Sequence, residues 1–149
     1  MKVPTKKAQK IKRLRVAKHL LNDSSERDMK LRIDEKKNIA YIKLSGLLSQ
    51  EVILRAFDLT VSDKRYKKGM GRLWDFRDAD LSSLDTETIA AMAQYSLKFP
   101  AGINDVKVAF VTSTDLEYGL SRMFEMLSNA RTPICVFRAM DEAENWMME

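Results

Sequence analysis

The chain has 149 residues, of which 45% are apolar and 32% are charged, as is usual for a soluble globular protein of one domain. No apolar run approaches the roughly 20 residues needed to cross a membrane, and we expect no secretory signal. The single Cys135 and the single His19 exclude an internal disulfide and argue against a zinc site or a Cys–His nucleophile pair. The sequence therefore predicts a cytoplasmic protein without a metal or cofactor, in which Cys135 is a buried free thiol.

The positive charge of the chain is confined to its first residues. Residues 1–27 contain nine Lys and Arg and two Asp and Glu, a net charge of +7. Residues 28–149 contain 17 Lys and Arg and 19 Asp and Glu, a net charge of −2. We therefore divide the chain into a basic leader, residues 1–27, and one domain, residues 28–149, which is not expected to bind nucleic acid.

The leader has the pattern of a basic amphipathic helix, because its apolar residues recur at helical spacing among many Lys and Arg. Such a helix can lie on an anionic membrane surface or bind another polyanion. Three alternatives stay open: a solvated arm, packing on its own domain or on a second copy, and a translation start at Met29.

The domain is predicted to open with a hairpin and a helix. Apolar and polar residues alternate over 29–34 and again over 40–45, with a polar turn at 35–38 between them. Ser49 is a favourable N-cap for a helix that is predicted to continue to about Val61.

The rest of the chain alternates between strands and helices. Strands are predicted over 72–76, 106–111 and 134–137, and helices over 86–98, 114–129 and 141–146. The N-cap signals are Asp85, Thr114 with Glu117, and Asp141 with Glu144. This alternation calls for parallel pairing with helical crossovers, so the fold class is α/β and a ligand is expected beyond the carboxyl ends of the strands.

The first candidate site follows the strand at 72–76. It contains Trp74, Asp75, Arg77 and Asp80, and an acid within an apolar strand requires a partner, for which Arg77 and Arg122 are the candidates. The alternatives are a structural ion pair, a loop-capping carboxylate, and a carboxylate pair for acid–base chemistry formed with Asp78 or Asp80.

The second candidate site is the third helix of the domain. Tyr118 and Arg122 lie four residues apart and so share one helical face, while a core face is predicted from Leu116, Leu120, Met123 and Leu127. Because a glycine inside a helix is unfavourable, Gly119 suggests a close backbone approach. The alternative for Arg122 is a local pair with Glu125.

The third candidate is a group of hydroxyls before the second helix, where Ser83 and Thr86 are candidate phosphorylation sites. A phosphate is electrostatically favourable at a helix N-terminus. The alternative is ordinary loop and cap hydrogen bonding.

From about Met29 to Trp146 the chain resembles the SpoIIAA-like family of the STAS/CRAL-TRIO superfamily. The matching features are the opening hairpin, the run Leu73-Trp74-Asp75-Phe76-Arg77-Asp78-Ala79, and the run Asp115-Leu116-x-Tyr118-Gly119-x-x-Arg122-Met123. The resemblance implies a mixed, mostly parallel five-stranded sheet in sequential strand order, wound as a βα superhelix, in a small bacterial cytoplasmic protein. The basic N-terminal helical extension lies outside it.

Members that antagonise anti-sigma factors carry a phosphorylatable Ser in an Asp-Ser-x-Gly motif before the corresponding helix. This chain has Ser82-Ser83-Leu84-Asp85-Thr86 there and lacks the Gly. The departure argues against the family's usual phosphorylation switch.

Our leading hypothesis is a non-enzymatic regulatory or protein-interaction module that binds a partner protein through the loop after Trp74 and the start of the third helix. The alternative is a carrier of a lipid or other apolar small molecule, as the CRAL-TRIO branch implies, with a pocket walled by Trp74, Phe76, Met92 or Met123. A homodimer is a further expectation if a sheet edge or face is left uncovered.

Overall fold

The computed structural model describes residues 29–128 and 132–149, so the predictions for the leader lie outside the described residues. The elements, in chain order, are β1 (Met29–Asp34), β2 (Ile39–Leu47), α2 (Gln50–Ser62), β3 (Gly71–Asp80), α3 (Thr86–Ser96), β4 (Val108–Val111), α4 (Asp115–Leu127), β5 (Ile134–Phe137) and α5 (Met140–Met147). Among the described residues, none of the helices has the length and hydropathy needed to cross a bilayer.

The five strands form one sheet in the order β1-β2-β3-β4-β5. β1 pairs antiparallel with β2, and the other neighbouring pairs are parallel. The predicted mixed, mostly parallel sheet in sequential order is therefore confirmed.

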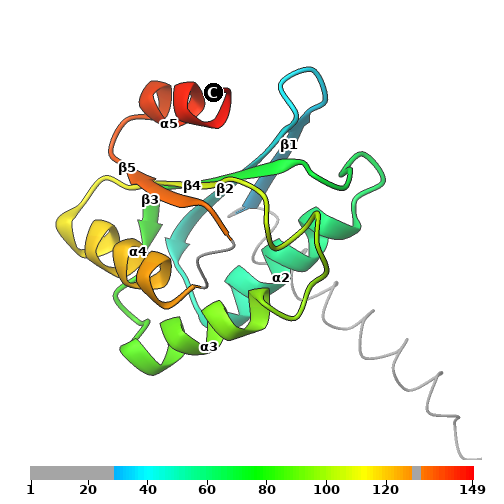
Figure 1. The fold of residues 1–149 in the computed structure, drawn as a ribbon. Helices are drawn as coiled ribbons and strands as arrows, with labels where there is room; N and C mark the ends of the chain where they lie inside the picture. Colours follow the sequence, from blue (N-terminus) through cyan, green and yellow to red (C-terminus); the bar gives the residue numbers. More distant parts are fainter. Residues whose placement is uncertain (1–28, 129–131) are drawn as a thin grey trace, which may run out of the picture.

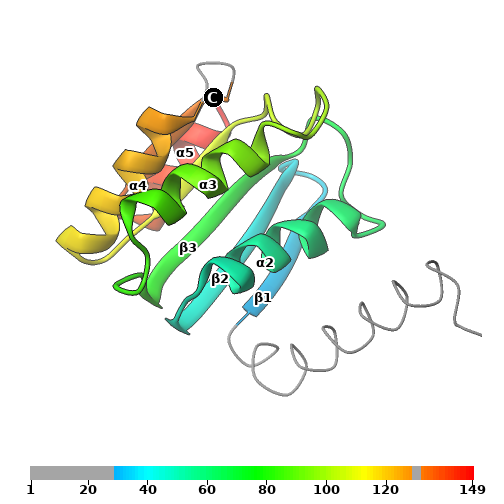
Figure 2. The same ribbon diagram turned by 90° about the horizontal axis from the view of Figure 1, so that it is seen from below.

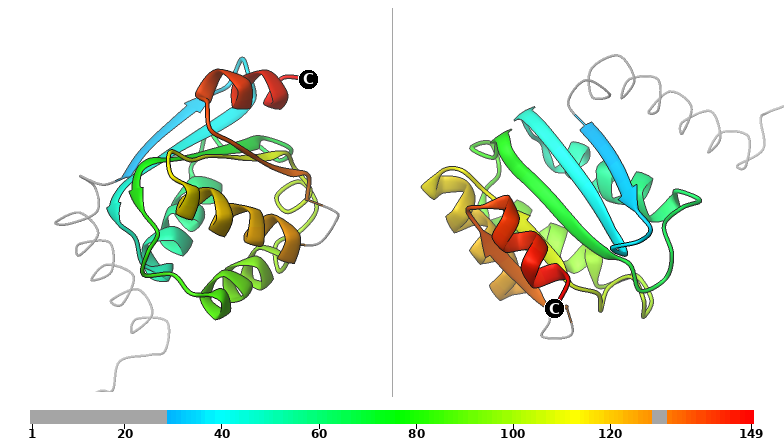
Figure 3. Two further views of the ribbon diagram at one scale, coloured as in Figure 1. Left: turned by 90° about the vertical axis from the view of Figure 1, so that its left-hand side faces the viewer. Right: turned by 90° about the horizontal axis from the view of Figure 1, so that it is seen from above.

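Helices cover the two faces of this sheet unequally. α2, α3 and α4 lie against one face and α5 against the other (Figure 1), and the view from below shows the first three side by side across the sheet (Figure 2). From above, α5 lies over the β4 and β5 side, away from β1 and β2 (Figure 3). The large core between the sheet and α2–α4 contains Ile42, Trp74, Phe76 and Phe110, and a smaller core under α5 is centred on Leu73 and Ala109.

Local hydrogen bonds explain where three helices begin. The side chains of Ser49, Asp85 and Thr114 accept from the backbone N–H three residues later, as their sequence signals predict. The N-cap prediction for α5 is wrong, because the cap residue is Ala139, without a side-chain hydrogen bond, and Asp141 lies inside the helix.

Strand β3 is longer than predicted. Residues 77–80, expected as a polar turn, continue the strand and pair with β2, through Ser45↔Asp78 and Leu47↔Asp80, after an irregularity in register. The loop expected directly after Trp74 is therefore the end of a strand.

The predicted core face of α4 is only partly right, because Leu120 and Met123 pack against the core but Leu116 and Leu127 do not. Leu116 is 49% exposed and Leu127 is 42% exposed, whereas Glu117 and Ser121 are buried. A Cβ added at Gly119 would meet nothing within 4 Å, so the suggested close backbone approach is wrong.

Candidate functional site

Asp75 is buried and paired with its neighbour in the sequence. Its carboxylate accepts from Arg77 Nε and Nη2, each at 2.9 Å, and from the Arg77 backbone N–H at 3.1 Å. Burial raises the pKa of Asp75, but the hydrogen bonds from Arg77 outweigh burial and leave the pKa below its usual value. Of the two partners proposed from the sequence, the structure selects Arg77.

The structure does not bring Asp75 and Arg122 together. Arg122 Nη1 lies 2.8 Å from Glu125 Oε2 on the exposed side of α4, which is the local alternative left open above. Side chains alternate along β3, so Asp75 points away from the face that carries Trp74 and α4. A single polar site joining these two residues is therefore not formed.

Tyr118 is partly buried at the start of α4 and contacts a residue that sequence reasoning missed. The Arg138 guanidinium carbon lies 4.8 Å from the centroid of the Tyr118 ring, and Arg138 Nη2 donates to Asp115 Oδ1 at 2.6 Å. Nearby, Ser113 Oγ donates to the Arg77 carbonyl at 2.8 Å. The carboxyl ends of β4 and β5 thus lie beside Arg77, just beyond the part of β3 that pairs with β4. We call the polar surface there the rim and define it as Arg77, Ser113, Asp115, Tyr118 and Arg138.

The remaining candidates make ordinary loop and cap contacts. Asp80 accepts from the Ser82 backbone N–H at 2.9 Å, and Ser83 Oγ donates to the Leu48 carbonyl at 2.6 Å. Thr86 is the exposed first residue of α3. In the described part of the chain, no three His, Cys, Asp or Glu side chains gather where they could hold a metal ion.

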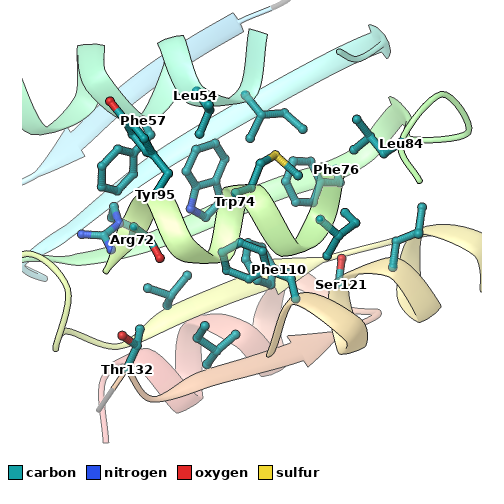
Figure 4. Close-up of a pocket in the computed structure, with 18 of the residues that line it drawn as sticks. Leu54, Phe57, Arg72, Trp74, Phe76, Leu84, Tyr95, Phe110, Ser121 and Thr132 are labelled. Atoms are coloured by element: carbon teal, nitrogen blue, oxygen red, sulfur yellow. The ribbon is translucent and has the colours of Figure 1, made fainter. Parts of the chain in front are cut away.

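The clearest concave feature is an apolar cavity between the sheet and helices α2, α3 and α4. It has a volume of about 80 Å³, is partly open to solvent, and is lined chiefly by large apolar side chains from β3, β4 and the three helices (Figure 4). Trp74, Phe76 and Met92, expected around a carrier's pocket, line it, but Met123 does not. Trp74 therefore lines the cavity, on the opposite face of the sheet from Asp75.

One charged side chain also lines the cavity. Arg72 is only 3% exposed, and in Figure 4 it lies at one end of the lining residues, with Leu84 toward the other end. Sequence reasoning missed Arg72 as a site residue, although a signal was present: alternation along β3 places it on the same face as Trp74 and Phe76. An arginine on a buried strand face is unusual.

No protein-family model matches the chain, and no curated protein matches it. A solved structure does: an uncharacterised protein of the DUF3478 family with a SpoIIAA-like fold from Shewanella loihica PV-4. The two chains are 15% identical, with a TM-score of 0.53 over 80% of this chain and 91% of that one. The chain has a SpoIIAA-like fold. At this identity the similarity establishes the fold alone, so function has to be argued from the residues of this chain.

Proposed function

We propose that this SpoIIAA-like protein is a binding module for an apolar small molecule, and that the cavity between the sheet and α2–α4 is its binding site. The observation that carries the proposal is a cavity of about 80 Å³ with largely apolar walls. One water needs about 10–15 Å³ in such a measure, so the space corresponds to roughly five to eight waters. Small-molecule sites are typically concave, apolar and provided with few polar groups.

The proposed role is that of a carrier or sensor and not of an enzyme. We also propose that the protein works in the cytoplasm. The arginines of the rim have carboxylate partners: Arg77 pairs with the buried Asp75, and Arg138 pairs with Asp115. The carrier role is also the one that the resemblance to the CRAL-TRIO branch implies.

The test is a binding measurement on the full chain. Native mass spectrometry of protein purified from cells is expected to show an added small-molecule mass, and calorimetry is expected to show saturable binding of one equivalent of an apolar probe such as octanol or octanoate. Ser121→Leu, which places an apolar side chain in the cavity, should abolish binding. Ser82→Leu, at an exposed position, is the matched control and should leave it unchanged.

An unmodified mass together with no saturable binding of either probe would overturn the proposal. Binding that survives Ser121→Leu would also count against it, because the probe would then occupy another place.

A second candidate function is docking of a partner protein on the polar rim. It is favoured by the exposed Leu116, 49% exposed, in the first turn of α4 beside the charged pair of Asp115 and Arg138. Exposed apolar side chains surrounded by charges are common at protein interfaces. Crosslinking in cells with a photoreactive group at position 116 tests it. A discrete adduct lost in Tyr118→Ala supports docking, and no adduct at any expression level contradicts it.

A further inference from the structure

Arg72 is a buried cation without an anionic partner among the described residues. Among the described residues, the only ionisable side chain that interacts appreciably with it is the phenol of Tyr66, and no Asp or Glu forms an ion pair with it. Burial lowers the pKa of the Arg72 guanidinium, and the contact with Tyr66 opposes that shift. Because the ordinary pKa of arginine lies far above neutrality, Arg72 stays charged.

The hydrogen bonds of Arg72 satisfy only one side of the guanidinium. Nη1 donates to Tyr66 Oη at 2.8 Å and to the Ile103 carbonyl at 2.7 Å. Nε is buried and has no acceptor, and within residues 29–128 and 132–149 Nη2 makes no hydrogen bond. Nε is enclosed by protein atoms, so Nη2 is the donor left for a ligand.

A buried charge with an unsatisfied donor destabilises the protein unless something compensates for it. The Phe57 ring gives partial compensation, since its centroid lies 4.9 Å from the guanidinium carbon. A purely structural arginine would donate to backbone carbonyls, as Nη1 does, but Nε does not. The missing partner is an acceptor that the described residues do not supply.

We propose that the ligand is an apolar monocarboxylic acid, such as a short- or medium-chain fatty acid, whose carboxylate accepts from Nη2 of Arg72 and neutralises the charge of the guanidinium. The hydrocarbon chain lies along the cavity between Trp74 and Phe110. This inference rests on the proposed function, because it assigns a chemical class to the ligand of the same cavity.

The chemistry of the site favours a carboxylate over a phosphate. A guanidinium forms strong charge-assisted hydrogen bonds with a singly charged carboxylate. A phosphate carries up to two charges and three acceptor oxygens, and the walls around Arg72 are largely apolar. One negative charge neutralises Arg72, and a second would remain buried without a partner.

The decisive experiment compares ligands of one chain length on the unaltered full chain by calorimetry at neutral pH. Octanoate is expected to bind at least about tenfold more tightly than octanol or methyl octanoate, because only the acid forms charge-assisted hydrogen bonds. Equal affinity of the three would overturn the carboxylate assignment and leave the apolar binding site standing. If none of the three ligands binds, both proposals are wrong. The two failures are therefore distinguishable.

A substitution of Arg72 tests whether the carboxylate binds this residue. Arg72→Met keeps the length of the side chain and removes its charge, so the preference for octanoate over octanol should disappear, while octanol should bind as before. Arg65→Met, at an exposed arginine paired with Asp63, is the control and should keep the preference. A preference that persists in a folded Arg72→Met protein would overturn the assignment to Arg72. If Arg72→Met does not fold, the ligand comparison on the unaltered chain still decides the class of ligand.

Discussion

The two faces of the sheet bury the same strands, β3 and β4, against very different amounts of helix. Three helices cover one face, yet a cavity remains beneath them. The single eight-residue helix α5 covers the other face, where Leu73, Ala109 and Val111 are completely buried. Helix number therefore does not determine how tightly a face is packed.

Side-chain size explains the difference. The core under α5 includes the small residues Ala109 and Ala143 among larger side chains. A Cβ added at Gly71 would lie 2.6 Å from Met147 Cε, so this helix lies close to the sheet. On the other face Trp74, Phe76 and Phe110 stack in a row, with successive ring centroids 5.9 and 5.7 Å apart. Large rigid rings hold helices away from the sheet and cannot bend to fill the space between them.

The largest loss of stability is expected from shortening a side chain on the tightly packed α5 face. Leu73→Ala removes a side chain that is completely buried, and should lower the free energy of unfolding by about 2–5 kcal/mol, measured by urea denaturation. Leu47→Ala, at a leucine that is 66% exposed, should change it by less than about 0.5 kcal/mol. A loss below about 1 kcal/mol for Leu73→Ala would show that the α5 face is also loosely packed.

Adding the same side chain to each face tests the comparison directly. Ala109→Leu, under α5, should lower the free energy of unfolding by about 1–3 kcal/mol, because the close-packed site has no room. Ser121→Leu, beside the cavity, should cost less than about 1 kcal/mol, because empty space accepts the side chain. Equal losses in thermal unfolding would contradict the difference between the faces.

The Asp75–Arg77 ion pair, on the α5 side of the sheet, should contribute less to the free energy of unfolding, and its contribution should depend on pH. Asp75→Asn removes a carboxylate whose pKa is held below its usual value of 3.8, so the native protein binds this proton less readily than the unfolded chain. The stabilisation is full above about pH 4 and is lost as the pH falls through the lowered pKa.

At neutral pH we expect Asp75→Asn to cost about 1 kcal/mol, since the Arg77 side chain is 42% exposed and solvent screens the pair. Unfolding curves at several pH values should show the native and variant proteins converging in acid. A difference that stays constant into acid would assign the loss to packing and not to charge.

The smallest change in the free energy of unfolding is expected from a substitution on the outer side of α4, the helix that borders the cavity. Gly119→Ala should raise the free energy of unfolding by about 0.5–1 kcal/mol, because alanine favours the helix and the new Cβ meets nothing within 4 Å. Gly46→Ala is the matched control: its Cβ also meets nothing, but its φ is +78°, so it should destabilise the protein by about 1 kcal/mol. A loss of stability in Gly119→Ala would indicate a contact on that side of α4.

Some features of the site can be predicted from the sequence and others cannot. The sequence leaves two candidate partners for Asp75, Arg77 and Arg122. The choice between them requires the position of Arg122, which lies on α4 against the opposite face of the sheet. For α4 the apolar spacing correctly predicts that Leu120 and Met123 pack against the core. It is wrong for Leu116 and Leu127, because Phe124 and the small Ser121 face the aromatic side chains of β3 and β4 instead.

The sequence by itself determined the order of the elements, the parallel pairing and the starts of α2, α3 and α4. These follow from hydrophobic periodicity and from hydrogen bonds that span three residues, so no distant part of the chain is needed. Only the tertiary structure decided that a cavity remains beside Trp74 and that Arg72 lies at its end, where residues 29–128 and 132–149 supply no anionic partner. Empty space and a missing partner are properties of how several elements pack together, and no local pattern in the chain encodes them.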